Sequence, residues 1–175
     1  MIDIENYGWQ TSMLPEDADG LPARITAVHR ERYELICSHG TIYGKLKTVI
    51  YYGQGEDFPT VGDFVLIQYE PTGDSLIIKT LPRWSFFSRR DPTPGRGEQA
   101  VAANFDTVFV MTSLNNDFNI GRLERYLTLT WQSNALPVVV LTKADLADDY
   151  KAQIAAVEEI AVGVDVIAVS AVNGQ

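Results

Sequence analysis

The chain has little that could hold a metal ion or form a disulfide. Its 175 residues include one cysteine, Cys37, and two histidines, His29 and His39. A single cysteine excludes an internal disulfide, and this set cannot supply the ligands of the usual zinc sites. The sequence therefore predicts no metal site within these residues.

Positive charge and long apolar runs are also scarce. The 14 Lys and Arg residues face 23 Asp and Glu, and the net charge of −9 argues against nonspecific attraction to nucleic acid or anionic lipid. No apolar run approaches the ~18 residues of a membrane span, and the N-terminus lacks the basic start and apolar core of a signal peptide. We expect a cytoplasmic protein with no membrane or DNA partner, in which any RNA contact is local.

Residues 21–82 have the pattern of a small β-barrel, because short apolar and β-branched runs are separated by turn-forming residues. The predicted strands are 21–29, 33–37, 41–52, 64–69 and 75–81. Five short strands with a longer loop at 53–60, before the fourth strand, favour an OB-type barrel. An SH3-like barrel would give much the same pattern.

The third predicted strand carries candidates for RNA contact. Lys45 and Lys47 could meet phosphates, and Tyr43, Tyr51 and Tyr52 could stack on bases. The alternative is that the rings pack the barrel and the lysines only face solvent, since Tyr and Lys are common on any half-exposed strand.

Two segments flank the barrel. Residues 1–20 are acidic and aromatic enough to predict a segment that docks on another surface. Residues 83–97 hold two prolines, two glycines and four arginines, a composition that resists regular structure and predicts a linker. Arg89 and Arg90 in this linker are further candidates for RNA contact; alternatively, its aromatic residues fasten it to a domain and its arginines keep it soluble.

Residues 98–175 alternate in period between strand and helix. Strands are predicted at 107–112, 138–142 and 164–169. The first helix would be capped by Asn115-Asn116-Asp117, and the second would begin at Leu146. The apolar face of the first helix is predicted to be Ile120, Leu123, Tyr126, Leu127 and Trp131. That of the second helix is predicted to be Leu146, Tyr150, Ile154, Val157 and Ala161. This order is typical of a parallel α/β domain, so the whole chain is predicted to be an α+β multidomain protein.

Polar side chains follow two of these strands. Thr142, Lys143 and Asp145 end one strand and Ser170-Ala171 end the next, at the edge where open parallel sheets bind ligands. A carboxylate there can accept two parallel hydrogen bonds from guanine, one from N1–H and one from the exocyclic amine. Adenine presents an acceptor at N1 and would be repelled by the carboxylate. The alternative role for Asp145 is to cap a helix that begins at Leu146.

The stem of Lys143 could lie along the base, and the Thr142 hydroxyl could tie neighbouring loops. A backbone N–H at Ser170-Ala171 could reach the guanine O6. A phosphate loop is not found: the nearest match to Gly-x-x-x-x-Gly-Lys-Ser/Thr, at 40–46, has the wrong spacing, lacks the magnesium-binding hydroxyl and lies in the barrel.

Four segments complete the pattern. They read Ala-Ala-Asn-Phe-Asp-Thr-Val at 102–108, Asn-Asn-Asp-Phe-Asn at 115–119, Arg-Leu-Glu-Arg-Tyr-Leu at 122–127 and Val-Leu-Thr-Lys-Ala-Asp-Leu at 140–146. With the barrel before them, they resemble the bacterial ribosome small-subunit-dependent GTPase A family, whose GTPase domain is circularly permuted. The resemblance implies GTP hydrolysis stimulated by the small ribosomal subunit, a role in its late maturation and a barrel that contacts ribosomal RNA. It also matches Thr142, Lys143, Ala144 and Asp145, with Ser170 and Ala171, to the guanine-binding motifs.

In that family the phosphate loop, the magnesium-binding switches and a zinc-binding segment follow the Ser-Ala motif. The chain therefore resembles an N-terminal fragment, divided into 1–20, 21–82, 83–97 and 98–175, the last being part of the permuted GTPase domain. We expect it to be inactive alone, with no catalytic residue of its own, and to self-associate through an apolar edge that its incomplete sheet exposes. The alternative is a non-enzymatic module that binds RNA or docks on the ribosome.

Overall fold

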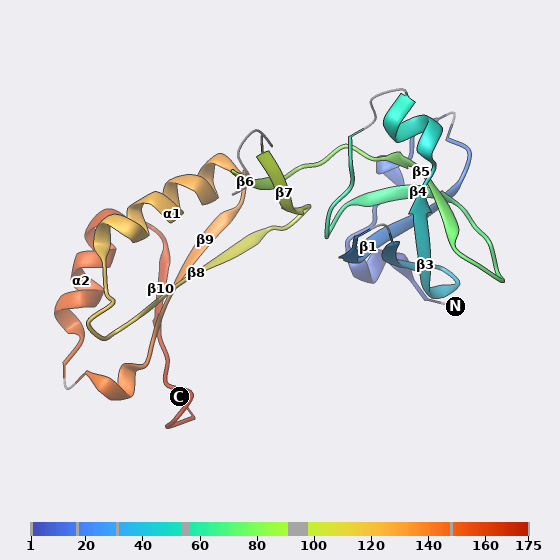
Figure 1. Ribbon diagram of the computed structural model, residues 1–175. Coiled ribbons are helices and arrows are strands. Elements are labelled where there is room, and N and C mark those ends of the chain that lie inside the picture. Colours follow the sequence, from blue (N-terminus) through green and yellow to red (C-terminus); the bar gives the residue numbers. More distant parts are fainter. Residues whose placement is uncertain are drawn as a thin grey trace. The chain divides into compact units, whose positions relative to one another are not determined.

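The computed structural model describes residues 2–16, 18–30, 32–53, 57–90, 98–147 and 149–174. The chain divides into two compact units, Met1–Asn104 and Phe105–Gln175 (Figure 1). Each unit has its own apolar core. The α+β multidomain organisation predicted from the sequence is confirmed. The finer division into four segments remains a prediction.

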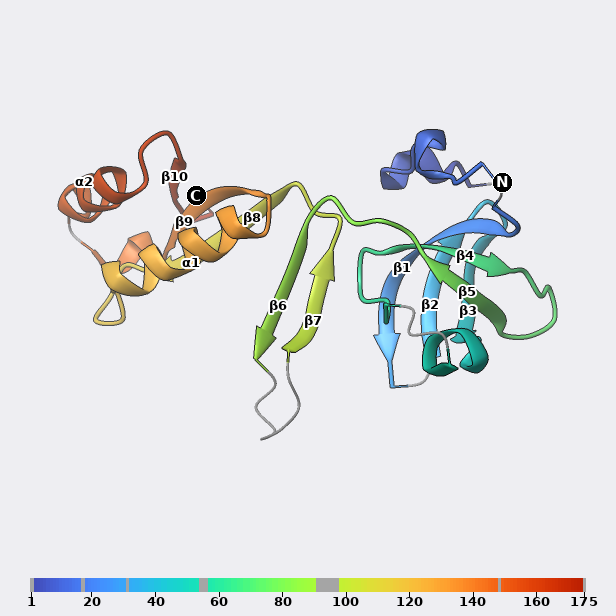
Figure 2. The same ribbon diagram turned by 90° about the horizontal axis from the view of Figure 1, so that it is seen from above.

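The first unit contains a closed barrel of five strands in the order β1-β2-β3-β5-β4 (Figure 2). The strands are β1 (Leu21–His29), β2 (Arg32–Cys37), β3 (Gly40–Leu46), β4 (Phe64–Gln68) and β5 (Ser75–Thr80). β1 pairs with both β2 and β4, and the parallel pair β3–β5 completes the closure. The OB-like barrel is thus confirmed.

The third strand is shorter than predicted. β3 ends at Leu46, and residues assigned to it form the helical segment η3 (Val49–Gly53). Tyr51 explains the difference: its ring is 2% exposed in the barrel core, and its hydroxyl lies 3.0 Å from that of Thr80. Burial of one ring therefore outweighs the strand propensity of the β-branched and aromatic residues around it.

A second small core forms on the outer side of β4. Trp9, between the short helices η1 (Ile4–Tyr7) and η2 (Thr11–Met13), is 8% exposed, and its ring centroid lies 5.5 Å from that of Phe64. Leu66 and Leu81 complete this core. The N-terminal segment thereby covers apolar surface that the barrel would otherwise expose.

The predicted linker contains a strand, contrary to expectation. β6 (Phe86–Arg90) pairs in antiparallel fashion with β7 (Glu98–Ala103); residues 91–97 lie outside the described part of the chain. The hairpin is tied to the barrel at Gly62, whose φ is +90° and where a Cβ would lie 2.0 Å from the Ala103 carbonyl oxygen. The Ala103 N–H in turn donates to the Val61 carbonyl at 2.9 Å.

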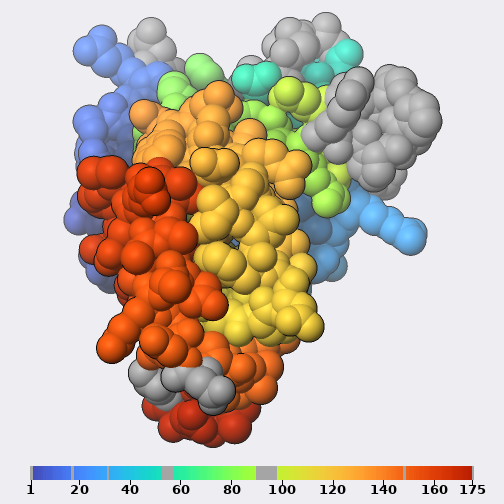
Figure 3. Space-filling model, turned by 90° about the vertical axis from the view of Figure 1, so that its left-hand side faces the viewer, coloured from blue at the N-terminus to red at the C-terminus, as the bar shows by residue number. Residues whose placement is uncertain are grey.

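The second unit is a parallel sheet in the order β10-β9-β8. Its strands are β8 (Thr107–Ser113), β9 (Leu136–Thr142) and β10 (Asp165–Ala168). The helices α1 (Ile120–Gln132) and α2 (Lys151–Ile160) pack on one face, where they bury Val110, Val139 and Leu141, and they form part of the surface seen in Figure 3. Phe109, Met111 and Leu136, at 64–71% exposure, belong to the other face.

Both helices depart in detail from the predictions. The N-cap of α1 is Asn119, whose side chain accepts from the Arg122 N–H at 2.9 Å, rather than the Asn115-Asn116-Asp117 run. Tyr126 and Trp131 are each 48% exposed and are not part of its buried face. α2 begins at Lys151, and Leu146 lies earlier, exposed, in the short helix η4 (Ala144–Leu146).

Candidate functional site

The carboxyl ends of β8, β9 and β10 meet at one edge of the sheet, because the three strands are parallel and adjacent. Thr142 ends β9 and ties this edge together. Its hydroxyl donates to the Thr112 carbonyl at 3.3 Å, and its own carbonyl accepts from the Leu114 N–H at 2.8 Å. The hydroxyl therefore joins two adjacent strands, rather than the neighbouring loops that the sequence predicted.

The chain turns sharply after Thr142. Lys143 has φ +61°, in the left-handed region that non-glycine residues seldom adopt, and its side chain is exposed. Ala144 is 7% exposed, and its N–H donates to the Val169 carbonyl at 3.1 Å. The turn is therefore fixed against the end of β10, and it presents Lys143 and Asp145 at the edge.

Asp145 is held by the next strand end. The Ser170 hydroxyl donates to Asp145 Oδ1 at 2.6 Å, and the same hydroxyl oxygen accepts from the Asn173 N–H at 3.2 Å. Ser170 is fully buried, whereas Asp145 is exposed. Since η4 begins after Lys143 and α2 begins at Lys151, the alternative role of Asp145 as the cap of a helix starting at Leu146 is wrong.

This arrangement suits a planar pair of donors. One carboxylate oxygen is oriented by a buried hydroxyl, while the exposed carboxylate keeps lone pairs for a ligand. Ala171 follows Ser170 in an exposed turn, and its small side chain leaves room for a ring close to the backbone. All six predicted residues, 142–145 and 170–171, thus lie at two adjacent strand ends.

An ion pair between Arg122 and Asp117, which the sequence did not predict, lies beyond β8. Arg122 Nη2 is 2.9 Å from Asp117 Oδ2, and both side chains reach solvent. Arg122 first, and the Lys143 ammonium after it, hold the pKa of Asp117 below its usual value. Asp117 therefore belongs to the surroundings of Lys143. Its signal in the sequence was its place in the segment that joins β8 to α1.

The predicted RNA-contacting residues lie in three different surroundings. Lys45 forms an ion pair with Asp74 at 2.9 Å. Lys47 lines a surface hollow together with Pro15 and Ile78. Arg89 donates to Gln99 across the β6–β7 hairpin, and the side chain of Arg90 lies outside the described residues.

Asp74 is the centre of a small charge network. Hydrogen bonds from Lys45 and then Arg32 lower its pKa from the usual 3.8, so the network is intact at neutral pH and is lost only in acid below that value. The Arg32 guanidinium also lies 3.9 Å from the centre of the Tyr43 ring.

Of the three tyrosines proposed to stack on RNA bases, Tyr43 and Tyr52 are exposed. Tyr51 is buried in the barrel core and is therefore excluded as a stacking ring.

Neither a metal cluster nor a membrane helix is found in the described part of the chain. Its His, Cys, Asp and Glu residues form no group of three or more that could hold a metal ion. None of its helices has the length and apolar character needed to cross a membrane. Residues 40–46, rejected as a phosphate loop, form β3 of the barrel.

Solved structures define the class to which this fold belongs. The chain resembles YjeQ from Thermotoga maritima with a TM-score of 0.71 and 21% identity, over 89% of this chain and 53% of that one. It resembles YloQ, described as a circularly permuted GTPase, with a TM-score of 0.66, the same identity and the same coverage. The chain therefore shares its fold with these two structures.

Sequence comparison identifies the family. The family model described as RsgA GTPase matches residues 80–175, and the chain belongs to that family. It is 41% identical to the small ribosomal subunit biogenesis GTPase RsgA 1 of Listeria innocua, over 92% of this chain and 46% of the relative. It is 37% identical to RsgA 2 of Lactiplantibacillus plantarum, over 99% of this chain and 51% of the relative. The chain spans about half the length of the curated relatives it matches.

Proposed function

We propose that the chain supplies the guanine-reading half of a GTP site in a GTPase that acts in the late maturation of the small ribosomal subunit. The observation that carries the proposal is the Asp145 carboxylate, held at the sheet edge by the buried Ser170 hydroxyl at 2.6 Å. The names of the relatives, small ribosomal subunit biogenesis GTPases, support the biological role.

Each residue of the site has a defined task in this proposal. Asp145 accepts the N1–H and the exocyclic amine of guanine, and an N–H of the Ser170-Ala171 turn donates to O6. The stem of Lys143 lies along the base plane. Thr142 and Ala144 fix the turn by their contacts with Thr112 and Val169.

Phosphate and magnesium binding, and the zinc of the family, belong outside residues 1–175 in this proposal. The support for this is that no segment of the sequence matches a phosphate loop. The partners are guanine nucleotide and the small subunit with its ribosomal RNA, met in the cytoplasm. Neither DNA nor a membrane has a part.

Nucleotide binding and turnover test this function. A protein of the relatives' length should bind fluorescent GDP in preference to fluorescent ADP, and small subunits should stimulate its GTP turnover. The 175-residue chain should show no turnover, with or without subunits. Equal affinity for the two nucleotides would refute the guanine site, and substantial turnover by the 175-residue chain would refute the placement of the phosphate site outside it.

The barrel favours a second candidate function, a non-enzymatic module that binds RNA. Tyr43 and Tyr52 are exposed on the barrel, and Lys45 reaches solvent at 57% exposure. If RNA contact is the role of the barrel, Lys45→Ala and Lys47→Ala should weaken binding to small subunits and reduce its salt dependence. If the two lysine variants lose subunit binding, and the parent protein shows no preference for guanine nucleotides, the RNA-binding module is favoured over the GTPase.

A further inference from the structure

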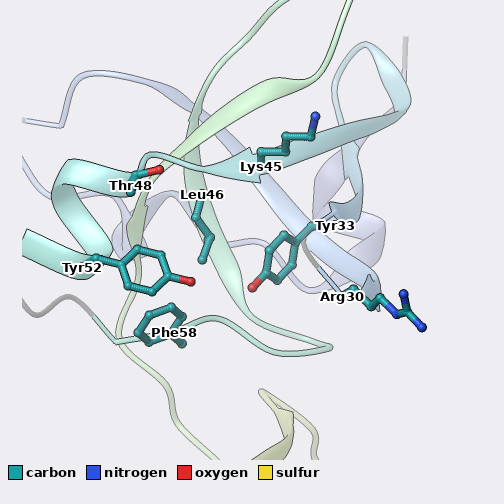
Figure 4. A pocket seen from close by; sticks show the side chains of 7 residues that line it. All are labelled: Arg30, Tyr33, Lys45, Leu46, Thr48, Tyr52 and Phe58. Atoms are coloured by element: carbon teal, nitrogen blue, oxygen red, sulfur yellow. The ribbon is translucent and has the colours of Figure 1, made fainter.

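A hollow of about 350 Å³ opens on the barrel between β2, β3 and the helical segment η3. Its wall, here called the tyrosine hollow, is formed chiefly by Arg30, Tyr33, Lys45, Leu46, Tyr52 and Phe58 (Figure 4). The volume is at the lower end of the range for small-ligand sites, on the order of 300–1,000 Å³. The hollow can thus admit one flat ring system with its attached groups.

Aromatic rings form much of the wall. Tyr52 and Phe58 are 71% and 46% exposed, and their ring centroids lie 5.1 Å apart at an interplanar angle of 75°. Rings exposed to this extent bury apolar surface when another ring packs on them, and the edge-to-face pair limits the movement of both. They therefore provide a stacking platform for a flat ligand.

The polar groups of the wall converge on the same space. The hydroxyls of Tyr33 and Tyr52 face one another across the hollow (Figure 4). Burial, and after it the nearby Tyr52, raise the pKa of Tyr33, so its hydroxyl stays protonated at neutral pH. Each hydroxyl can donate and accept, which suits the mixed donors and acceptors on the edge of any nucleobase.

Two cations stand at the rim. Arg30 lies in the β1–β2 turn and Lys45 on β3, and both side chains extend away from the aromatic centre (Figure 4). The face formed by the second and third strands is the one with which OB barrels bind oligonucleotides. Bases inside a duplex are stacked and paired, so only an unstacked base could enter.

We propose that the tyrosine hollow takes one unstacked base of single-stranded RNA, while Arg30 and Lys45 contact the adjoining phosphates. The inference rests on the RNA-contacting role proposed for the barrel and adds the form of RNA and the residues that receive it. The paired hydroxyls predict a weak preference among the four bases.

The test uses the 175-residue chain and a fluorescein-labelled single-stranded RNA of about twelve nucleotides, within the site size of an OB fold. Tyr52→Ala should weaken binding about 5- to 150-fold, the factor that corresponds to a lost stacking energy of ~1–3 kcal/mol. Tyr52→Phe should retain most of the affinity. Val49→Ala is the matched control, since Val49 is 70% exposed in the same helical segment and does not line the hollow. Unchanged circular dichroism will establish that each variant is folded.

The possible outcomes distinguish failure of the tyrosine hollow from failure of RNA contact by the barrel as a whole. If Tyr52→Ala binds the single strand as well as the parent does, while Lys45→Ala binds more weakly, the hollow is refuted and RNA contact by the barrel survives. If the parent binds no RNA at low salt, both fail. Tyr52-dependent binding to whole subunits, without binding to free RNA, would indicate a protein occupant and would also overturn the inference.

Discussion

The Asp63–Arg83 ion pair gives the most quantitative prediction about the first unit. Asp63 is fully buried, and it accepts from Arg83 Nε at 2.8 Å, from Arg83 Nη2 at 2.7 Å and from the Thr60 N–H at 2.7 Å. Arg83→Met leaves the carboxylate buried, with the Thr60 N–H as its remaining hydrogen-bond donor among the described residues. Breaking a buried pair in this way costs ~3–5 kcal/mol, and because Arg83 is itself 17% exposed we expect about 3 kcal/mol.

Urea unfolding measures this loss. With an m-value of ~1.5 kcal/mol/M, the midpoint should fall by about 2 M. Trp131→Phe removes the tryptophan of the second unit, so that the fluorescence reports on Trp9 and Trp84 in the first. Asp63→Asn combined with Arg83→Met should cost much less than the sum of the two single changes, because the double variant has no unpaired buried charge. A midpoint shift below about 0.5 M, or additive losses, would refute the reasoning.

Three further predictions concern the site, the charge network and the open sheet. Ser170→Ala in a protein of the relatives' length should weaken guanine nucleotide binding by about 2- to 10-fold, because it removes the hydrogen bond that orients the exposed Asp145 carboxylate, a contribution of ~0.5–1.5 kcal/mol. An unchanged affinity in titration calorimetry would show that this hydrogen bond does not contribute to nucleotide binding. Asp74→Asn should tighten RNA binding and steepen its salt dependence, since it releases Lys45 for phosphates; weaker binding in an anisotropy titration would contradict this. The 175-residue chain should self-associate through the exposed sheet face, and Phe109→Glu should reduce the association; sedimentation of the parent as a strict monomer would argue against it.

Local patterns predicted most strands of both units but missed the β6–β7 hairpin. Four of the five barrel strands were predicted within one residue at each end, because alternating burial and turn residues are visible over short stretches. The third failed at η3, where Tyr51 is drawn into the barrel core by residues distant in sequence. β6 and β7 were both missed: they pair with each other across a segment rich in proline and glycine, and that segment suggested a linker.

The site shows the same division between local and distant information. The rule that parallel strands share a ligand edge predicted that residues 142–145 and 170–171 would be neighbours. It could not predict the Ser170–Asp145 hydrogen bond, which joins side chains 25 positions apart. Nor could it place the start of α2, because Asp145 before Leu146 is a common helix-start pattern, whereas the chain forms η4 and delays the helix to Lys151.

The most direct test of the guanine site is a change of base preference in Asp145→Asn. Guanine presents two donors, N1–H and the amine, whereas xanthine presents N1–H and an acceptor oxygen, which matches the carbonyl and amide of asparagine. In a protein of the relatives' length, GDP binding should weaken about 5- to 150-fold, or ~1–3 kcal/mol, and xanthosine diphosphate binding should strengthen. An unchanged ratio of the two affinities would contradict the account of Asp145 as the residue that reads the base.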